Sequence, residues 1–268
     1  MVHSIRVISN AAERVADGTY GDPLPVKTQD EIGHLIESFN IMVKGLKERD
    51  FISNTFGRYV DQEIARELMS RPEATRLGGE KRAVAILMSD LRDFTPLSET
   101  LSPDVTISML NRYFSRMIDT IQKHRGIIVD FFGDALLIFF DPMEGSVKSS
   151  IHKAILCALE MQRNMEIFNA ENRSEGLPEL KMGIGVNAGE VVVGNIGSEA
   201  RAKYGIVGSS VNVTQRIQSH AKGGEVVVSE SVHKAMDNLV IKKAFNARLK
   251  GIEEPVSLYV VEVWHDQD

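Results

Sequence analysis

The chain contains a single cysteine, Cys157, among its 268 residues, so it cannot form an internal disulfide. A protein without disulfides is typical of a reducing compartment. Cys157 is spaced like a helical neighbour of Ala154, Ala158 and Met161. We therefore expect it to be a small residue of the core, with a reactive thiol as the alternative.

Several other features are also missing. No apolar run reaches about 18 residues, so no segment is expected to span a membrane. The first residues lack the apolar core of a signal peptide. The net charge of −6 argues against nucleic-acid binding, which requires a basic face. The seven histidines form neither an HExxH motif nor a cluster with cysteine, so we expect no zinc site.

The first fifty residues predict two short amphipathic helices joined by an extended connector. The connector contains Leu24-Pro25-Val26, whose proline cannot continue a helix. The second helix is predicted to begin near Asp30-Glu31, where acidic side chains favour a helix N-terminus. Apolar residues recur in both helices at steps of three and four: Ile5, Ile8, Ala12 and Val15, then Ile32, Leu35, Phe39, Met42 and Leu46.

Two such narrow stripes bury little surface alone, so we expect this segment to pair with a second chain. Residues 1–48 resemble a HAMP domain, the parallel four-helix relay that follows a transmembrane helix in bacterial receptors. The alternative is an ordinary amphipathic hairpin. The residues that carry the resemblance are Val15-Ala16-Asp17-Gly18, Pro25, Asp30-Glu31-Ile32-Gly33-His34-Leu35 and Ser38-Phe39-Asn40.

Residues 49–80 are interpreted as a helical linker that ends at Arg71-Pro72. From residue 81 to 265 the pattern alternates between strands and helices, which predicts an α+β domain. Expected strands cover residues 83–88, 127–131, 135–140, 181–188, 191–196, 226–229, 241–249 and 256–263, and the strands 181–188 and 191–196 are expected to form a hairpin around Gly189. Expected helices cover 103–126, with Ser102 as N-cap and a stripe of Ile107, Leu110, Phe114, Met117 and Ile121, then 149–168 and 211–220.

Two aspartates follow apolar strands in this domain. Asp90 lies at the end of the first predicted strand, directly after the apolar run 83–88 and Ser89. Asp134 lies beside Gly133 at the tip of the next predicted hairpin. Neighbouring carboxylates of this kind can hold two Mg²⁺ ions about 3.5–4 Å apart. A turn-forming role is the alternative for Asp134, but buried runs on both sides make an unpaired carboxylate costly. The backbone after Leu91 is expected to enter a helix whose free N–H groups can bind phosphate.

A second group of polar residues follows Gly208-Ser209-Ser210. Asn212 and Arg216 lie one helical turn apart and therefore share a face. Arg216 can stabilise charge on a phosphoryl group and Asn212 can position a sugar, although most such pairs only face solvent. Lys250, before Gly251, is a candidate phosphate contact, with an ordinary surface lysine as the alternative.

Together these features resemble the catalytic domain of class III adenylate and guanylate cyclases, a ferredoxin-like or palm-like βαββαβ fold. The resemblance covers roughly residues 81–263. Its motifs are Phe56-Gly57-Arg58-Tyr59-Val60, residues 89–95, Phe132-Gly133-Asp134-Ala135, residues 183–189, residues 204–216 and Leu249-Lys250-Gly251.

The resemblance implies a role for each matching residue. Asp90 and Asp134 fall on the aspartates that bind two Mg²⁺ or Mn²⁺ ions, with the Leu91 backbone carbonyl as a further ligand. Asn212 falls on the ribose-positioning asparagine and Arg216 on the transition-state arginine. The remaining matches imply substrate contacts by Phe94, Thr95, Asp130, Gly205 and Lys250.

The resemblance also implies a homodimer with two equivalent sites, because one chain carries both residue sets that the family shares across its dimer. The implied reaction is attack of the ribose 3′-hydroxyl on the α-phosphate, with pyrophosphate leaving. The whole protein is expected to be anchored in the inner membrane by an upstream sensor, with this part in the cytoplasm.

The alternative to an active enzyme is a degenerate cyclase domain that acts as a regulatory module. A diguanylate cyclase is set aside, because its Gly-Gly-Asp/Glu-Glu-Phe turn is absent.

The residues that would select the purine base of the substrate differ from the family pattern. Asp130 stands where the family places an adenine-reading lysine, and Gly205 stands at the second selector position. An ionised aspartate only accepts hydrogen bonds, so it suits the N1–H and amino group of guanine. HAMP-linked bacterial members of the family usually make cyclic AMP, and on that analogy we expect ATP as substrate, with GTP as the alternative.

Overall fold

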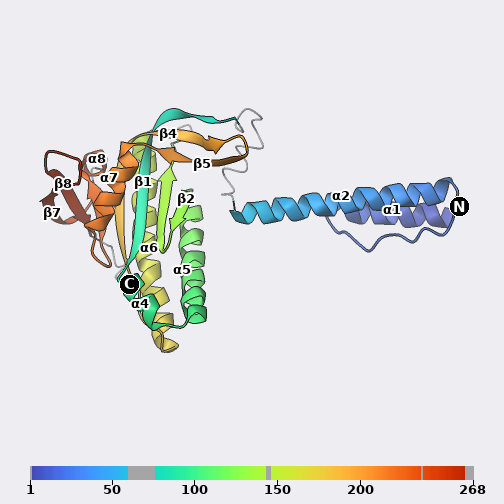
Figure 1. Cartoon of the computed structure of the whole chain (residues 1–268), viewed down its shortest axis with the longest axis horizontal. Helices are drawn as coiled ribbons and strands as arrows, with labels where there is room; N and C mark the ends of the chain where they lie inside the picture. Colours follow the sequence, from blue (N-terminus) through green and yellow to red (C-terminus); the bar gives the residue numbers. More distant parts are fainter. Residues whose placement is uncertain (1, 60–75, 143–145, 237, 263–268) are drawn as a thin grey trace. The chain divides into compact units, whose positions relative to one another are not determined.

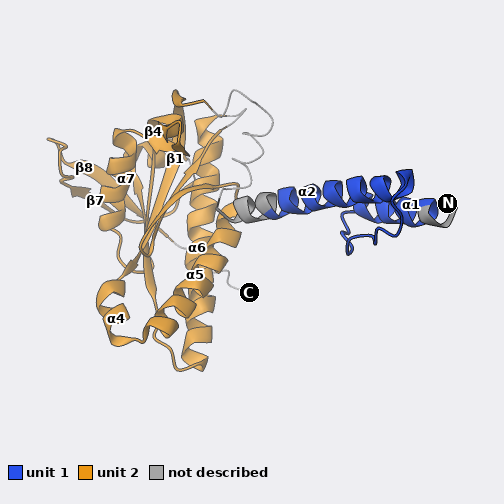
Figure 2. Cartoon of the chain, turned by 45° about the vertical axis from the view of Figure 1, so that its right-hand side comes forward, with its two compact units in different colours: residues 1–65 blue, residues 66–268 orange. Residues whose placement is uncertain are grey.

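The computed structural model describes residues 2–59, 76–142, 146–236 and 238–262 (Figure 1). The chain divides into two compact units, residues 1–65 and residues 66–268 (Figure 2). Among the described residues, no helix combines the length and apolar character needed to cross a bilayer. Residues 60–75 of the predicted linker, including its expected end at Arg71-Pro72, lie outside the described residues.

The first unit consists of helix α1 (Val2–Ala16), a connector and helix α2 (Glu31–Tyr59). Asp30 caps α2, because its Oδ1 accepts from the backbone N–H groups of Ile32 and Gly33, each at 3.1 Å. Hydrogen bonds from the Thr28 hydroxyl and these N–H groups lower the pKa of Asp30. The two predicted helices and the acidic start of the second are therefore confirmed.

The connector is fastened to α2 by Asn40. The Asn40 side chain donates to the Leu24 carbonyl and accepts from the Leu24 N–H, both at 2.8 Å. Ala11, Ile36 and Val43 are buried within this unit, whereas Leu35 and Met42 are 48% and 50% exposed. Much of the predicted heptad stripe thus lies outside the contact between α1 and α2 of one chain.

The second unit is built on one sheet, which in the described residues has the order β2-β3-β1-β4-β6-β8-β7, with β5 paired to β4. Antiparallel pairing of β1 with β4 runs from Gly78↔Asn195 to Arg92↔Lys181 and forms the centre. The strands are β1 (Gly78–Arg92), β2 (Ile127–Phe132), β3 (Ala135–Phe140), β4 (Lys181–Ser198), β5 (Arg201–Val207), β6 (Val226–Ser229), β7 (Ile241–Ala247) and β8 (Val256–Val261).

Helices cover both faces of this sheet. Along β4 the even-numbered residues from Met182 to Val186 face the main core, whereas Gly183 and Gly185 face α7. Figure 1 shows α5 and α6 side by side on one face. The helices are α4 (Phe94–Thr100), α5 (Pro103–Lys123), α6 (Val147–Ser174), α7 (Ser209–Ser219) and α8 (Glu230–Ala235). The α+β fold expected from the sequence is confirmed.

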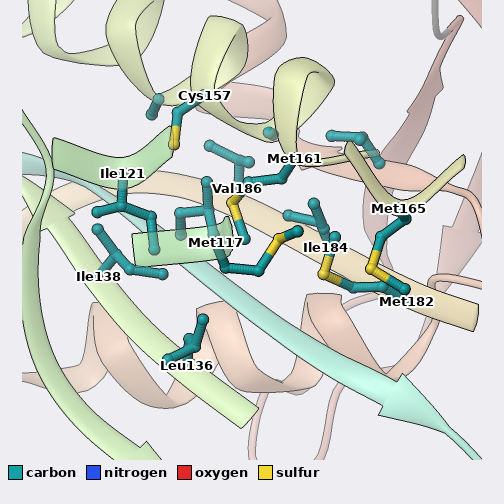
Figure 3. Close-up of a cluster of buried hydrophobic side chains, with 14 of the residues drawn as sticks. Met117, Ile121, Leu136, Ile138, Cys157, Met161, Met165, Met182, Ile184 and Val186 are labelled. Atoms are coloured by element: carbon teal, nitrogen blue, oxygen red, sulfur yellow. The ribbon is translucent and has the colours of Figure 1, made fainter. Parts of the chain in front are cut away.

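The main core fills the space between the sheet and helices α5 and α6 (Figure 3). Cys157 is fully buried there, as predicted, and burial raises the pKa of its thiol. The predicted N-cap of α5 is also confirmed, since the Ser102 side chain accepts from the Val105 N–H at 3.4 Å. The predicted stripe of α5 is only partly right. Ile107 is exposed, whereas Met109 and Tyr113 are buried with Met117 and Ile121.

The predicted hairpin around Gly189 is wrong. Residues 181–198 form one continuous strand, because β1 pairs with β4 on both sides of the Val84↔Gly189 position. The chain reverses later, where Ser198 faces Arg201 at the start of β5. Strand β5 was not expected from the sequence. The last two strands end slightly earlier than expected, at Ala247 and Val261.

Candidate functional site

Asp90 and Asp134 lie together at one end of the β1–β3 pair. Asp90 follows the Ser89↔Leu136 position of that ladder, and Asp134 precedes β3. The Leu91 N–H donates to Asp134 Oδ2 at 2.9 Å, so the second carboxylate sits on the backbone next to Asp90. Burial and the negative charge of Asp134 raise the pKa of Asp90. The two carboxylates therefore converge, as the sequence predicted.

The turn between β2 and β3 fixes Asp134. Phe132 pairs with Ala135, so the turn contains only Gly133 and Asp134. Gly133 has a φ of +66°, a conformation that residues with a side chain rarely adopt. This short turn holds Asp134 close to the end of β1.

The two aspartates suit a hard divalent cation. Carboxylate oxygens are preferred ligands of Mg²⁺ and Mn²⁺, and a cation would relieve the repulsion that raises the pKa of Asp90. No group of three or more histidine, cysteine, aspartate or glutamate side chains is placed to hold a metal within the described ranges. Further ligands would have to come from substrate, water or backbone. Metal binding by the Leu91 carbonyl stays a prediction, since it is the Leu91 N–H that contacts Asp134.

Arg92 was not predicted as part of the site. Its Nη1 lies 3.3 Å from Asp90 Oδ1, and its Nη2 donates to the Gln218 carbonyl of α7 at 2.7 Å. The positive charge of Arg92 lowers the pKa of Asp90 and so partly opposes the effect of Asp134. Arg92 thereby joins the aspartate pair to the C-terminal end of α7.

Glycines of β4 allow α7 to lie against the sheet. A Cβ on Gly183 would lie 2.5 Å from Arg92 Nη2, and one on Gly185 would lie 2.5 Å from the Gln218 backbone nitrogen. A Cβ on Gly189 would lie 2.5 Å from the Ser210 hydroxyl at the start of α7. The Gly183–Gly189 motif is therefore explained by close approach of α7 and Arg92.

Helix α7 brings Arg216 to the turn that contains Lys250. The Ile252 N–H donates to the Leu249 carbonyl at 3.0 Å, which closes the turn, and Gly251 has a φ of +77°. A Cβ on Gly251 would lie 3.5 Å from Arg216 Nη1. Within the described residues, Arg216 forms no ion pair, so its charge is available to an anion.

Asn212 is exposed on α7, one turn before the half-buried Arg216, and Lys250 is exposed. The three residues therefore belong to one region, α7 and the adjoining turn. The phosphate and sugar roles of these side chains stay predictions.

The predicted base selectors lie on β2 and β5. The Asp130 carboxylate pairs with Lys203 Nζ at 2.5 Å and accepts from the Phe131 N–H at 2.9 Å. Gly205 is buried, and a Cβ there would lie 3.1 Å from the Val129 side chain. Lys203 was not predicted as a site residue, although it precedes Gly205 by two residues and therefore shares its strand face.

Phe94 and Thr95, at the start of α4, were predicted to contact the substrate. Phe94 is only 8% exposed and belongs to the main core, so its side chain is occupied with packing. Thr95 is exposed, and its carbonyl accepts from the Ser98 hydroxyl at 2.7 Å. A ligand can reach the Thr95 side chain, whereas the Phe94 side chain packs in the core, and substrate contact by either residue stays a prediction.

Comparison with known families matches both units. Residues 79–262 match the adenylate and guanylate cyclase catalytic domain. Residues 1–48 match the HAMP domain. The first match covers more than half of the chain.

Relatives extend the match across both units. The uncharacterized proteins Rv1320c and Rv1318c of Mycobacterium tuberculosis are each 32% identical over 259 residues, which is 95% of this chain. The matched region is 44% of the first relative and 46% of the second. The chain thus spans less than half the length of these relatives.

Solved cyclase structures match most of the chain. The guanylyl cyclase Cya2 is 41% identical, with a TM-score of 0.67, over 71% of this chain and 97% of that one. The adenylyl cyclase CyaB of P. aeruginosa is 27% identical, with a TM-score of 0.66, over 71% and 98%. A bacterial light-regulated adenylyl cyclase is 19% identical, with a TM-score of 0.71, and supports the fold alone.

Proposed function

We propose that this chain, which belongs to the family of adenylate and guanylate cyclase catalytic domains and carries a HAMP domain at its N-terminal end, converts GTP into 3′,5′-cyclic GMP and pyrophosphate. The observation that carries the proposal is the convergence of Asp90 and Asp134 beside Leu91. The acceptor character of Asp130 supports the choice of guanine.

The aspartate pair would hold the two Mg²⁺ or Mn²⁺ ions that the family implies. When bound, such ions lower the pKa of an attacking hydroxyl and neutralise charge on a triphosphate. Arg216 has no ion pair among the described residues and would stabilise charge on the phosphoryl group. Asn212 would orient the ribose, and Lys250, on the turn beside Arg216, would bind the terminal phosphates.

A homodimer with two equivalent sites is part of the proposal. One chain would supply Asp90 and Asp134, and the other would supply Asn212 and Arg216. Each chain contains both groups, so two identical chains can complete two sites.

GTP is preferred over the ATP expected from the sequence. The ATP expectation rested on analogy with HAMP-linked relatives, whereas Asp130 presents a carboxylate and buried Gly205 presents no side chain. A carboxylate can accept from both the N1–H and the amino group of guanine. The guanylyl cyclase Cya2 is 41% identical to this chain.

ATP is the second candidate. An adenylyl cyclase matches the same unit at 27% identity, and the Lys203 ammonium beside Asp130 can donate to N1 of adenine. Both reactions would use the same aspartates and the same arginine.

Turnover with purified full chain tests the proposal. The chain is incubated with Mn²⁺ and either GTP or ATP, and the products are separated by chromatography. Cyclic GMP from the wild type, lost in Asp90→Asn, is the expected result. Absence of cyclic product from both triphosphates would contradict the cyclase and favour a regulatory module with a cyclase fold.

Regulation through residues 1–48 is also proposed. A HAMP domain suits a signal relay from an upstream membrane sensor to a catalytic domain at residues 81–265, through a linker at residues 49–80. This places the catalytic domain on the cytoplasmic side of the inner membrane in the whole protein.

A further inference from the structure

A polar cavity of about 450 Å³ lies where α6 passes the start of β4 and the loop that joins α7 to β6. The residues that line it differ from those proposed to bind the nucleotide and the metal ions. Part of its wall belongs to the main core, where Met165 of α6 and Met182 of β4 are both buried (Figure 3). The volume of the cavity suits a small organic molecule.

One buried side chain presents an unpaired oxygen to this cavity. Gln162 is only 5% exposed, and its Nε2 donates to the Met182 carbonyl at 2.9 Å and to the Glu225 carbonyl at 3.2 Å. These two acceptors fix the orientation of the amide, because a flipped amide would set oxygen against oxygen. Among the described residues no group donates to Gln162 Oε1, and this atom is not fully enclosed, so it faces the cavity. The cavity therefore offers a fixed acceptor to a ligand that donates hydrogen bonds.

The charges on the lining favour a positively charged donor beside this oxygen. The charged lining residues are Glu166, Glu179, Glu225, Glu262, Lys181 and Lys242, a net charge of −2. Glu179 is paired with Arg173 at 2.5 Å, whereas Glu225 and Glu262 form no ion pair within the described part of the chain. Glu225 is half-buried, and its backbone carbonyl already contacts Gln162. An ammonium group here can donate to both an amide oxygen and a carboxylate, and such charge-assisted hydrogen bonds are strong.

Hydrogen bonds hold the walls of the cavity in place without a ligand. On α6, the Asn169 side chain donates to the Leu180 carbonyl and accepts from the Leu180 N–H, both at 2.8 Å. On the side of the α7–β6 loop, the Gly224 N–H donates to the Met182 carbonyl at 2.8 Å. A Cβ on Gly224, whose φ is +83°, would meet nothing within 4 Å, so the space beside the loop is open. Little ordering of the lining is therefore needed on binding.

We propose that this cavity binds a small organic molecule through an ammonium group. The ammonium donates to Gln162 Oε1 and to the Glu225 carboxylate. At the other end of the ligand, Glu262 accepts from a second ammonium group, or Lys181 and Lys242 pair with a carboxylate. The site goes beyond the proposed cyclase reaction and does not depend on it.

Isothermal titration calorimetry of the full chain with three probes of four carbon atoms tests the inference, without nucleotide or metal. The probe 1,4-diaminobutane carries two ammonium groups, 4-aminobutyrate carries one ammonium and one carboxylate, and succinate carries two carboxylates. We expect at least one ammonium probe to bind with a Kd below about 1 mM, and succinate to bind at least about tenfold more weakly than that probe. A tighter diamine indicates a second ammonium beside Glu262, and a tighter 4-aminobutyrate indicates a carboxylate beside the two lysines. Both results support the site.

Variants of the lining provide the second test. Glu225→Gln combined with Glu262→Gln keeps the shape of the lining, removes two negative charges and should weaken binding of the tighter ammonium probe at least about tenfold. Glu37→Gln combined with Glu48→Gln removes the same charge from exposed positions on α2 and should keep the wild-type affinity. Gln162→Met removes the Oε1 acceptor and should weaken binding about fivefold. Since Gln162 also donates to two carbonyls, thermal unfolding checks that this variant is folded, and the double glutamate variant decides the test if it is not.

Several results would overturn the inference. They are a Kd above about 1 mM for both ammonium probes, succinate bound as tightly as they are, or an affinity of the Glu225/Glu262 double variant within about twofold of wild type. An equal loss in the α2 control would also overturn it, since binding would then follow the overall charge of the chain. No nucleotide is present in these titrations, so a failure of the proposed reaction leaves their outcome unchanged.

Discussion

The Arg92 guanidinium occupies the space that a side chain on Gly183 would need. A Cβ at position 183 would lie 2.5 Å from Arg92 Nη2 and 2.7 Å from Nε. The same guanidinium contacts Asp90 and the Gln218 carbonyl at the end of α7. The missing side chain of Gly183 therefore helps to position Asp90 relative to the helix that carries Arg216.

Gly183→Ala should lower turnover by displacing Arg92. We expect kcat for cyclic nucleotide formation to fall about tenfold, since small displacements of positioning groups have effects of at least this size. KM should change less, because Arg92 is not proposed to contact substrate. Gly45→Ala on α2 is the control, since a Cβ there meets nothing within 4 Å. Equal kcat values for wild type and Gly183→Ala would contradict a positioning role for Arg92.

Asp90→Asn should stabilise the metal-free protein at neutral pH while abolishing turnover. Burial and Asp134 raise the pKa of Asp90 in the folded state, so folding favours the protonated form. The resulting increase in the free energy of unfolding is fully present below the pKa that Asp90 has in the unfolded chain. It is lost as the pH rises through the pKa that Asp90 has in the folded chain. At a pH above the folded-state pKa of Asp90, its ionised carboxylate lowers the free energy of unfolding, and the neutral asparagine removes this destabilisation.

Thermal unfolding in a chelator measures the effect. Near pH 7 we expect Tm to rise by about 1–3 °C in Asp90→Asn, as a change of 1 kcal/mol shifts Tm by about 2–4 °C in domains of this size. The difference should shrink as pH falls below the folded pKa of Asp90, where the wild type is protonated as well. An Asp90→Asn variant that unfolds earlier than wild type at neutral pH would show that Arg92 outweighs Asp134.

The sequence predicted the aspartate pair because its signals are local. Asp90 follows an apolar run, and Asp134 lies beside Gly133 between two apolar strands, so both were expected at strand ends. The structure places both at the same end of the β1–β3 pair. Strand composition and turn chemistry were sufficient here.

Contacts between distant residues could not be predicted in this way. Arg92 contacts a carbonyl 126 residues away, and Lys203 pairs with a carboxylate 73 residues away. Gly189 was misread as a turn, because a sequence does not show that a glycine is needed for the approach of Ser210. Tyr113 was not predicted as a core residue, yet it is fully buried and its hydroxyl donates to Met182 Sδ at 3.4 Å.

Met42→Lys should weaken pairing of the first unit with a second chain. Met42 is half exposed in the single chain, so a lysine there leaves the α1–α2 contact intact but places charge in the predicted heptad stripe. We expect a lower dimer fraction and a several-fold loss of turnover. Analytical ultracentrifugation gives the dimer fraction. His34→Lys, at a side chain that is 78% exposed on the same helix, is the control. An unchanged dimer fraction in Met42→Lys would contradict the predicted seam.

Mixing two inactive variants should restore activity if each site is shared between chains. Asp90→Asn removes a proposed metal ligand, and Arg216→Ala removes the proposed phosphoryl contact, with an expected loss of about 10²–10³ in kcat. A heterodimer of the two variants contains one site with both lesions and one site with neither. Random exchange makes about half of the dimers mixed, so the mixture should reach about a quarter of wild-type activity. Chromatographic measurement of cyclic nucleotide, before and after subunit exchange, provides the readout. A mixture no more active than its components would mean that each chain builds its site alone.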